Sequence, residues 1–264
     1  MPRPNKTLSK KKLIVFDLDG TLTETKSDLE ADMAEELRRL LKSKQVAVIG
    51  GGTYQQFKKQ FVSRLHCPPA LLSRLYLFPT TATSFYRYRH GWKKVYVHEL
   101  SAIERKAIKV AFNEVLQAIT YVHPKKVYGK VIEDRKTQVT FSALGQDIVA
   151  QLGNKGVKMK EEWVKKNRPL KVKIARLVQK SLPKLHVHAS GFTSIDVTRK
   201  GIDKAYGVRQ IEKKLHVKIK DMVFIGDALF PGGNDYAARK SGIDCIPVKG
   251  PQDTKRVISS ILRS

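Results

Sequence analysis

The sequence predicts an α/β protein, a Rossmann-like parallel-sheet core interrupted by an inserted α+β segment. Short apolar runs of strand length alternate with amphipathic helical patterns at the start of the chain, which is typical of a parallel sheet. The alternation stops near residue 84 and returns near residue 190. Carboxylates also stand directly after two of the predicted strands, where an open α/β sheet forms its sites.

The first part of the predicted core covers residues 1–84. Apolar runs at 13–16, 46–49 and 75–78 predict three buried strands, and Pro79 stops the third. Between them, residues 28–42 and 53–65 have the periodicity of helices. The first helix places its apolar residues on one face: Leu29, Met33, Leu37, Leu40 and Leu41.

The second part of the core is predicted at residues 189–264, after an α+β insert at 85–188. The insert has strand patterns at 92–99 and 127–141 and helical patterns at 103–119 and 163–180. The core then resumes with alternating elements, predicted as helices at 203–215, 234–241 and 254–262 and strands at 222–225 and 245–248.

Length and composition predict one or two packed domains and exclude a disordered or disulfide-stapled chain. The chain has 264 residues, 41% of them hydrophobic and 28% charged. Its two cysteines, Cys67 and Cys245, form no Cys-x-x-Cys pair, which favours a reducing compartment. No apolar run is long enough to span a membrane, and the basic N-terminal tail lacks the apolar segment of a signal peptide. We therefore expect a soluble cytoplasmic protein without a membrane partner, and leave monomer and homodimer open.

The charge balance is unusual, with 51 Lys and Arg against 24 Asp and Glu and a formal net charge of +27. Such a field favours polyanions, acidic membrane surfaces and phosphorylated small molecules alike. The insert is the more basic part of the chain. Non-specific polyanion binding by this surface is therefore one expectation, beside a small phosphorylated substrate.

The first candidate site is Asp17-Leu18-Asp19-Gly20-Thr21, just past the first predicted strand. Two carboxylates two residues apart can project into one crevice, where their repulsion must be offset by a cation or a proton. Mg²⁺ suits this because hard cations prefer oxygen ligands. The alternative is a polar turn whose aspartates cap a helix.

A second strand end, Ile225-Gly226, leads into Asp227, and a glycine-rich loop then returns to Asp235. These carboxylates would supply further metal ligands, although Gly-Asp after a strand is often only a turn. Lys204, near the start of a predicted helix, would offset negative charge on Asp17 and on a transferring phosphoryl group if it reaches the crevice. A solvated position is the alternative for this lysine.

The glycine run Gly50–Gly52 lies between a predicted strand and the helix that begins at Thr53. Backbone N–H groups in such a run can form a nest for phosphate oxygens. Gly51, Gly52 and Thr53 are therefore candidate phosphate-binding residues, with a plain turn as the alternative.

Together these motifs resemble the haloacid dehalogenase superfamily of phosphotransferases, and the insert resembles the cap of its type IIB members. Within that superfamily the chain is similar to eukaryotic phosphomannomutases along nearly its whole length after the basic tail. The resemblance is carried by four segments: Ile132-Glu133-Asp134-Arg135, Ser194-Ile195-Asp196-Val197, Gly226-Asp227 through Gly232-Gly233-Asn234-Asp235, and Gln252-Asp253-Thr254-Lys255-Arg256.

The resemblance implies a catalytic core at 1–84 and 189–264 and a specificity cap at 85–188. Asp17 would form an aspartyl-phosphate, Asp19 would act as general acid and base, and Lys204 would neutralise the pocket. Mg²⁺ would be held by Asp17, the backbone carbonyl of Asp19, Asp227 and Asp235. In the cap, Arg135, Ser194 and Asp196 match substrate-binding positions.

The departures from the family pattern favour one activity over another. A phosphomannomutase holds a sugar with two phosphates, and bidentate arginines for the distal phosphate are hard to replace. Here Gln146 stands where one arginine is expected, another expected arginine falls near Gly153, and a third corresponds to Lys26. We therefore expect a Mg²⁺-dependent phosphatase acting on a sugar phosphate or similar metabolite. A mutase and a polyanion- or nucleic-acid-binding protein on this fold are the alternatives.

Overall fold

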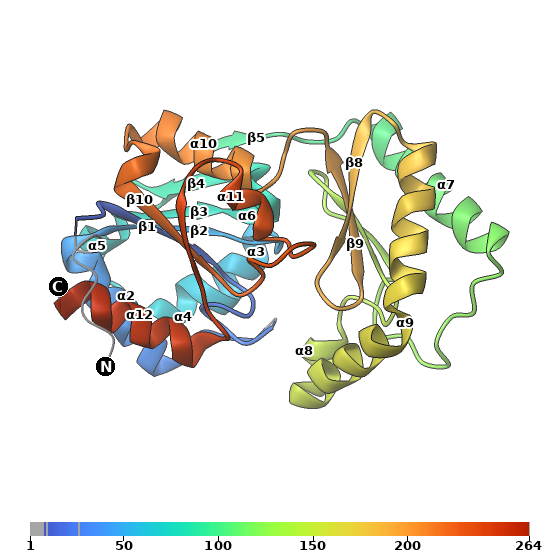
Figure 1. Ribbon diagram of the computed structural model, residues 1–264, viewed down its shortest axis with the longest axis horizontal. Coiled ribbons are helices and arrows are strands. Elements are labelled where there is room, and N and C mark those ends of the chain that lie inside the picture. The colour runs from blue at the N-terminus through green and yellow to red at the C-terminus, as the bar shows by residue number, and fades with distance from the viewer. Residues whose placement is uncertain (1–7, 9, 26, 264) are drawn as a thin grey trace. The chain divides into compact units, whose positions relative to one another are not determined.

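The computed structural model describes residue 8, residues 10–25 and residues 27–263. The chain folds into two compact units (Figure 1). Unit 1 comprises Met1–Val97 and Asp203–Ser264, and unit 2 comprises His98–Ile202. Among the described residues, none of the helices is both long and apolar enough to cross a membrane.

Unit 1 is built on a seven-stranded sheet with the order β11-β10-β1-β2-β3-β4-β5. The first five strands in this order are parallel, and β4 and β5 extend the sheet as an antiparallel hairpin. The parallel strands are β11 (Asp244–Pro247), β10 (Met222–Gly226), β1 (Leu13–Asp17), β2 (Gln45–Ile49) and β3 (Leu75–Phe78). The hairpin consists of β4 (Ser84–Tyr88) and β5 (Trp92–Val97).

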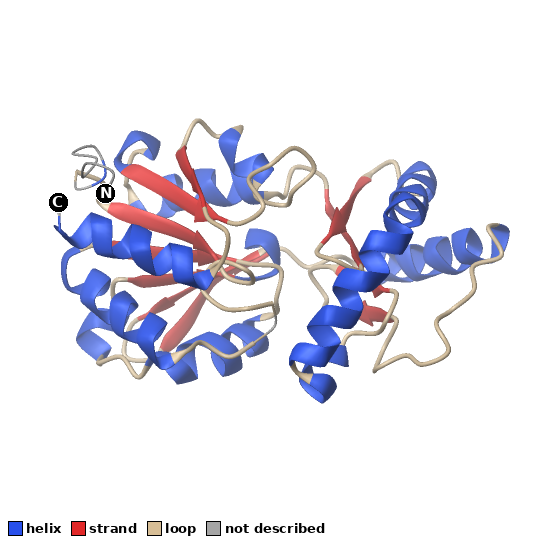
Figure 2. Ribbon diagram, turned by 60° about the horizontal axis from the view of Figure 1, so that its bottom comes forward, coloured by secondary structure: helices blue, strands red, loops and turns tan. Residues whose placement is uncertain are grey.

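Helices cover both faces of this sheet (Figure 2). Alternation along β1 sends Ile14 and Phe16 into one apolar core and Leu13 and Val15 into the other, as the period of a strand requires. The first core is closed by α2 (Ala31–Ser43), a helical segment from 54 to 65 and α12 (Pro251–Arg263). That segment comprises α3 (Tyr54–Gln56), the π-helix η1 (Phe57–Val62) and α4 (Ser63–Leu65). The second core includes residues of α10 (Lys204–Leu215), α11 (Tyr236–Arg239) and α6 (Pro79–Ala82). The short α5 (Pro69–Leu72) and the 3₁₀ turn η2 (Ile219–Asp221) complete the unit.

Unit 2 contains a four-stranded antiparallel sheet in the order β6-β7-β9-β8. Its strands are β6 (Ile132–Asp134), β7 (Val139–Ser142), β9 (Ser194–Arg199) and β8 (Leu185–Ser190). Helices α7 (Ala102–Ala118) and α9 (Asn154–Ser181) bury one face of the sheet, and the short α8 (Ile148–Leu152) packs against α9. The other face of the sheet carries polar side chains.

The structure divides the chain at other residues than the predicted 84/85 and 188/189. The hairpin of β4 and β5, at 84–97, belongs to the core sheet because β4 pairs with β3. Strands β8 and β9, at 185–199, belong to unit 2 because they pair with each other and with β7. The changes in sequence pattern lie close to the observed boundaries. The hairpin of β4 and β5, however, belongs to unit 1, and strands β8 and β9 belong to unit 2.

Candidate active site

The two aspartate motifs meet because their strands are neighbours in the sheet. Strand β1 ends at Asp17, and β10 ends at Gly226, one residue before Asp227. The strands pair in parallel with Phe16 opposite Ile225, so both carboxyl ends lie at the same edge. Strand β1 is flanked by β2 on one side and by β10, distant in sequence, on the other. This is a switch point, where open α/β sheets form binding crevices.

Three carboxylates converge at this edge. One oxygen each of Asp17, Asp227 and Asp235 lies within 4.8 Å of the others. Asp235 is held by a hydrogen bond from the Ala228 backbone N–H, 2.9 Å from its Oδ2. Asp227 accepts a hydrogen bond of 3.1 Å from the Thr21 hydroxyl. The two motifs are therefore tied together by side chains.

Lys204 is the cation of this cluster. It is the first residue of α10, its side chain is fully buried, and its Nζ donates to Asp17 Oδ1 and Asp235 Oδ1. Burial by itself lowers the pKa of Lys204, but the two carboxylates outweigh this effect and raise it, so the lysine is charged. In unit 1, the Lys204 ammonium therefore lies between the carboxylates of Asp17 and Asp235.

The anionic forms of Asp17 and Asp227 are destabilised by their surroundings. Burial, with repulsion from Asp235 and Asp227, raises the pKa of Asp17 well above its usual value, and Lys204 opposes this shift. Burial and the charge of Asp235 also raise the pKa of Asp227. The single positive charge of Lys204 therefore does not neutralise the three carboxylates.

The donor set fits a hard divalent cation. Three carboxylate oxygens close together, incompletely neutralised, form the environment that Mg²⁺ prefers. Asp17, Asp227 and Asp235 could hold the ion, and Asp19 lies two residues beyond Asp17 in the same turn. When bound, the ion would offset the negative charge of the carboxylates and of phosphoryl oxygens.

The turn after β1 brings the backbone close to the second motif. Gly20 has a φ of +89°, and a Cβ on this residue would lie 2.7 Å from Asp227 Oδ2. Its N–H donates to the Thr23 carbonyl at 2.7 Å, which closes the turn. Asp19, in the same turn, is half-buried and stays within reach of solvent. Only glycine fits the close approach at position 20.

The glycine run lies at the carboxyl end of β2, next to β1. Gly51 has open space where a Cβ would stand, so a ligand can approach its backbone. Thr53 forms a capping box with Gln56, in which each side chain accepts from the other's backbone N–H. The Thr53 hydroxyl oxygen therefore caps the helical segment, and its O–H remains a donor.

A strained turn beside the glycine run has no signal in the sequence. Thr80, Thr81 and Ala82 follow β3 with φ of 48°, 55° and 65°, a left-handed run that is rare for residues other than glycine. The N–H groups of Thr80 and Thr81 donate to the carbonyls of Gly52 and Gly50 at 2.8 and 2.9 Å. The turn holds the glycine run in place, and local strain of this kind is concentrated at functional sites.

The candidate substrate-binding residues of the cap lie on the polar face of the sheet in unit 2. The strand register places four side chains in one row across this face: Glu133, Thr140, Asp196 and His188. Asp196 accepts hydrogen bonds from Thr140 Oγ1 at 2.7 Å and Ser190 Oγ at 2.5 Å. Ser194 lies opposite Ser142 and Ser190 in the next row. Glu133, Thr140 and Ser190 are parts of this face that the sequence analysis did not identify.

Arg135 lies next to this row and is engaged within unit 2. Its Nε donates to Glu133 Oε2 at 2.6 Å, and one terminal nitrogen donates to Gln146 Oε1 at 3.1 Å. The side chain is only 7% exposed. The guanidinium thus faces a carboxylate and an amide, and Gln146 occupies the position where the family pattern has an arginine. Lys26, the third departure, lies outside the described residues.

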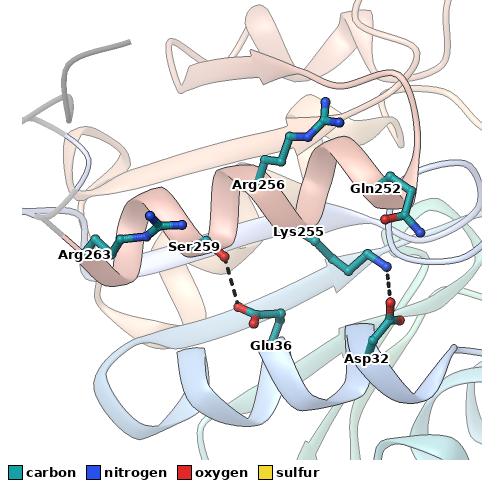
Figure 3. A pocket seen from close by; sticks show the side chains of 7 residues that line it. All are labelled: Asp32, Glu36, Gln252, Lys255, Arg256, Ser259 and Arg263. Atoms are coloured by element: carbon teal, nitrogen blue, oxygen red, sulfur yellow. Dashed lines mark hydrogen bonds and ion pairs between the residues drawn. The ribbon is translucent and has the colours of Figure 1, made fainter. Parts of the chain in front are cut away.

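A pocket of about 420 Å³ in unit 1 lies apart from the three aspartates, between α2 and α12 (Figure 3). It is bridged by an ion pair of Lys255 with Asp32 and by a hydrogen bond of 3.5 Å from Ser259 to Glu36. The family-like segment at 252–256 therefore joins two helices and has no part in the aspartate cluster. The pocket is lined by Asp32, Glu36, Gln252, Lys255, Arg256, Ser259 and Arg263.

The fold and the aspartate–lysine cluster define a phosphoryl-transfer enzyme of the haloacid dehalogenase superfamily. A family model described as eukaryotic phosphomannomutase matches residues 33–264. The chain belongs to this family.

Curated relatives agree with this assignment. A phosphomannomutase of Encephalitozoon cuniculi is 25% identical over 256 residues, covering 96% of this chain and 94% of the relative. Phosphomannomutase 1 of Dictyostelium discoideum is 27% identical over 255 residues, covering 94% of this chain and 96% of the relative. The similarity is thus distant but extends over both units.

Solved structures share the fold at lower identity. An IMP-nucleotidase of Plasmodium falciparum superposes with a TM-score of 0.69 at 18% identity, covering 96% of this chain and 68% of that one. A haloacid dehalogenase-like hydrolase of Bacteroides thetaiotaomicron has a TM-score of 0.60 at 13% identity, with 95% and 99% coverage. These similarities support the superfamily fold.

Proposed function

We propose that this chain is a Mg²⁺-dependent phosphatase that hydrolyses a small phosphorylated metabolite, with sugar phosphates as the first class to test. The observation that carries the proposal is the state of Arg135. Its Nε donates a hydrogen bond to Glu133 Oε2 at 2.6 Å, and a terminal nitrogen donates one to Gln146 Oε1. This region therefore offers no free pair of guanidinium groups for a second phosphate. An intermediate that is not held by such a clamp leaves, and water then accepts the phosphoryl group.

The residues of unit 1 can perform both half-reactions. A carboxylate oxygen of Asp17 attacks phosphorus, the bond to the leaving oxygen breaks, and Asp19 gives that oxygen its proton. Asp19 then removes a proton from water, whose oxygen attacks phosphorus. The bond to Asp17 breaks, which releases inorganic phosphate and restores the carboxylate. Lys204 fixes Asp17 and offsets its charge throughout.

The direct test is phosphate release from a panel of sugar phosphates with and without Mg²⁺. Asp17→Asn keeps the shape of the side chain and removes the nucleophile, so we expect a loss of about 10³-fold or more. Asp28→Asn is the matched control, because Asp28 is a surface residue paired with Arg64. Full activity of the Asp17 variant would exclude the aspartyl-phosphate route.

A phosphomannomutase activity is the second candidate, favoured by the family match and by the names of the curated relatives. It would convert hexose 1-phosphates and 6-phosphates into each other and need a bisphosphate activator. Chromatographic separation of the products distinguishes the two activities. Gln146→Arg restores the side chain of the family pattern, and under the phosphatase proposal it should raise the share of isomerised product over free phosphate. An unchanged share would indicate that Gln146 does not set the outcome.

A further inference from the structure

One face of α9 carries an unusual series of cations. The helix has no acidic residue after Glu162, and six basic side chains between there and its end are exposed: Lys165, Lys166, Arg168, Lys173, Arg176 and Lys180. At the 100° per residue of an ideal helix, Arg168 stands apart and the other five fall within an arc of about 100°. These five extend over about 22 Å of the helix axis, with Pro169 inside the stretch. We call these five side chains the α9 basic face.

The α9 basic face is turned away from the core of unit 2. Ile174, Ala175 and Val178, on the opposite side of the helix, pack with Phe141, Ile195 and other residues of the sheet and α7. Figure 1 shows α9 beside strand β8 of that sheet. The polar row that contains Asp196 lies on the far face of that sheet. A ligand on α9 would therefore not compete with a ligand on the polar face.

Among the described residues, these five cations form no ion pair and no side-chain hydrogen bond. On α2 and its neighbours, by comparison, four cations are paired with acids: Arg38 with Glu35, Arg39 with Glu36, Arg64 with Asp28, and Lys255 with Asp32. On α9, Lys173 and Arg176 are three residues apart and Arg176 and Lys180 four, so neighbouring like charges repel. An anion bound along the helix would remove this cost.

The other side chains of this surface narrow the choice of anion. Among the described residues of α9, Val172 is the one exposed large apolar side chain, with 52% of its surface accessible. One such side chain provides too little apolar surface for insertion into a membrane. Trp163, the one aromatic residue of α9, packs against the core of unit 2 and is not available for base stacking. What remains is a series of positive charges spaced along the helix, which complements the repeating negative charge of a phosphodiester backbone. Duplex nucleic acid has the highest linear charge density and releases the most counterions.

We propose that the α9 basic face binds the backbone of duplex nucleic acid without reading its sequence. This binding is separate from the phosphatase activity and does not depend on it. Five phosphate contacts at about 0.9 ions each predict that affinity falls about 10²- to 10³-fold between 50 and 200 mM salt.

The test uses the full chain and a fluorescent 20-base-pair duplex of mixed sequence, with anisotropy measured over a series of salt concentrations. One variant carries Lys166→Gln, Lys173→Gln, Arg176→Gln and Lys180→Gln. The matched control carries Lys58→Gln, Lys59→Gln, Lys213→Gln and Lys214→Gln, four exposed lysines of unit 1, and so has the same net charge. Circular dichroism checks that both remain folded.

We expect the α9 variant to bind at least tenfold more weakly than the control, with a salt slope reduced by about three to four. Equal weakening in both variants would contradict the proposal, since binding would then reflect net charge alone. Tighter binding of a single strand than of the duplex, or binding of phosphatidylserine vesicles with no binding of the duplex, would also overturn it.

Discussion

Lys204 supplies the positive charge that stabilises the aspartate cluster in its ionised form. It lies between Asp17 and Asp235, all three side chains being at most 3% exposed. Removing one partner from a buried ion pair leaves uncompensated charge and costs about 3–5 kcal/mol. Its position at the start of α10 fixes it relative to β1 and β10 without a flexible loop.

Lys204→Met is therefore expected to lower the free energy of unfolding by about 3–5 kcal/mol in Mg²⁺-free buffer and to reduce phosphate release about 10²-fold or more. Lys213→Met, at an exposed position of the same helix, is the control and should change neither. Denaturant titration with and without Mg²⁺ measures the first effect. A fully stable Lys204 variant would mean that the three carboxylates do not need its charge.

At the scale of elements, the left-handed turn after β3 is a source of strain. Thr81 is β-branched and has a φ of 55°, which costs about 1–2 kcal/mol relative to a residue without a Cβ. Thr81→Gly should raise the free energy of unfolding by about 1 kcal/mol, after the entropic cost of glycine is subtracted. Thr81→Val keeps the branching and should bring no gain. A destabilised glycine variant, measured by denaturant unfolding, would contradict the strained geometry.

The hairpin of β8 and β9 is held by a buried lysine of α9. Lys171 Nζ donates to the carbonyl of Gly191 at 2.7 Å and lies 3.4 Å from those of Ser190 and Phe192. Burial, with repulsion from Arg168, lowers the pKa of Lys171 to about 8, and Asp196 opposes the shift. The unfolded chain keeps the proton to about pH 10.4, so between these values the unfolded state binds more protons.

It follows that the contribution of Lys171 to stability rises with pH from about 8 to about 10.4. We expect the difference in unfolding free energy between wild type and Lys171→Met to be constant below pH 7.5 and to move in favour of wild type above pH 8. The comparison cancels the other lysines, which titrate in both proteins. A difference that does not vary with pH would show that the ammonium is not destabilised by its position.

The sequence was sufficient for the parts of the molecule that are local in the chain. Asp17, Asp19 and Asp227 follow apolar runs whose strand character is evident, and a parallel sheet then dictates that they share an edge. Long-range pairing was not predictable. Thr140 and Asp196 are 56 residues apart and meet only through the register of β7 and β9. No residue type in this segment predicts the left-handed turn at Thr80, because threonine normally avoids a positive φ.

At the scale of the whole molecule, the error in the unit boundaries has the same origin. Strand β4, Ser84–Tyr88, contains three aromatic residues and one arginine and is as compatible with a cap as with the edge of the core sheet. Its pairing with β3 places β4 in the core sheet, and this pairing is a property of the assembled sheet rather than of the segment itself. Both units together carry the family resemblance, whereas the aspartate cluster belongs to unit 1 and the polar row to unit 2.

We expect Asp17 to pass the phosphoryl group that it accepts to water. The most direct measurement is ³¹P NMR of a single reaction that contains a hexose 1-phosphate, Mg²⁺ and a trace of the hexose 1,6-bisphosphate, because inorganic phosphate and both monophosphates are resolved together. Transfer to water predicts growth of the inorganic phosphate signal with little 6-phosphate. Conversion to 6-phosphate with little free phosphate would contradict it and show that the chain retains the intermediate as a mutase does.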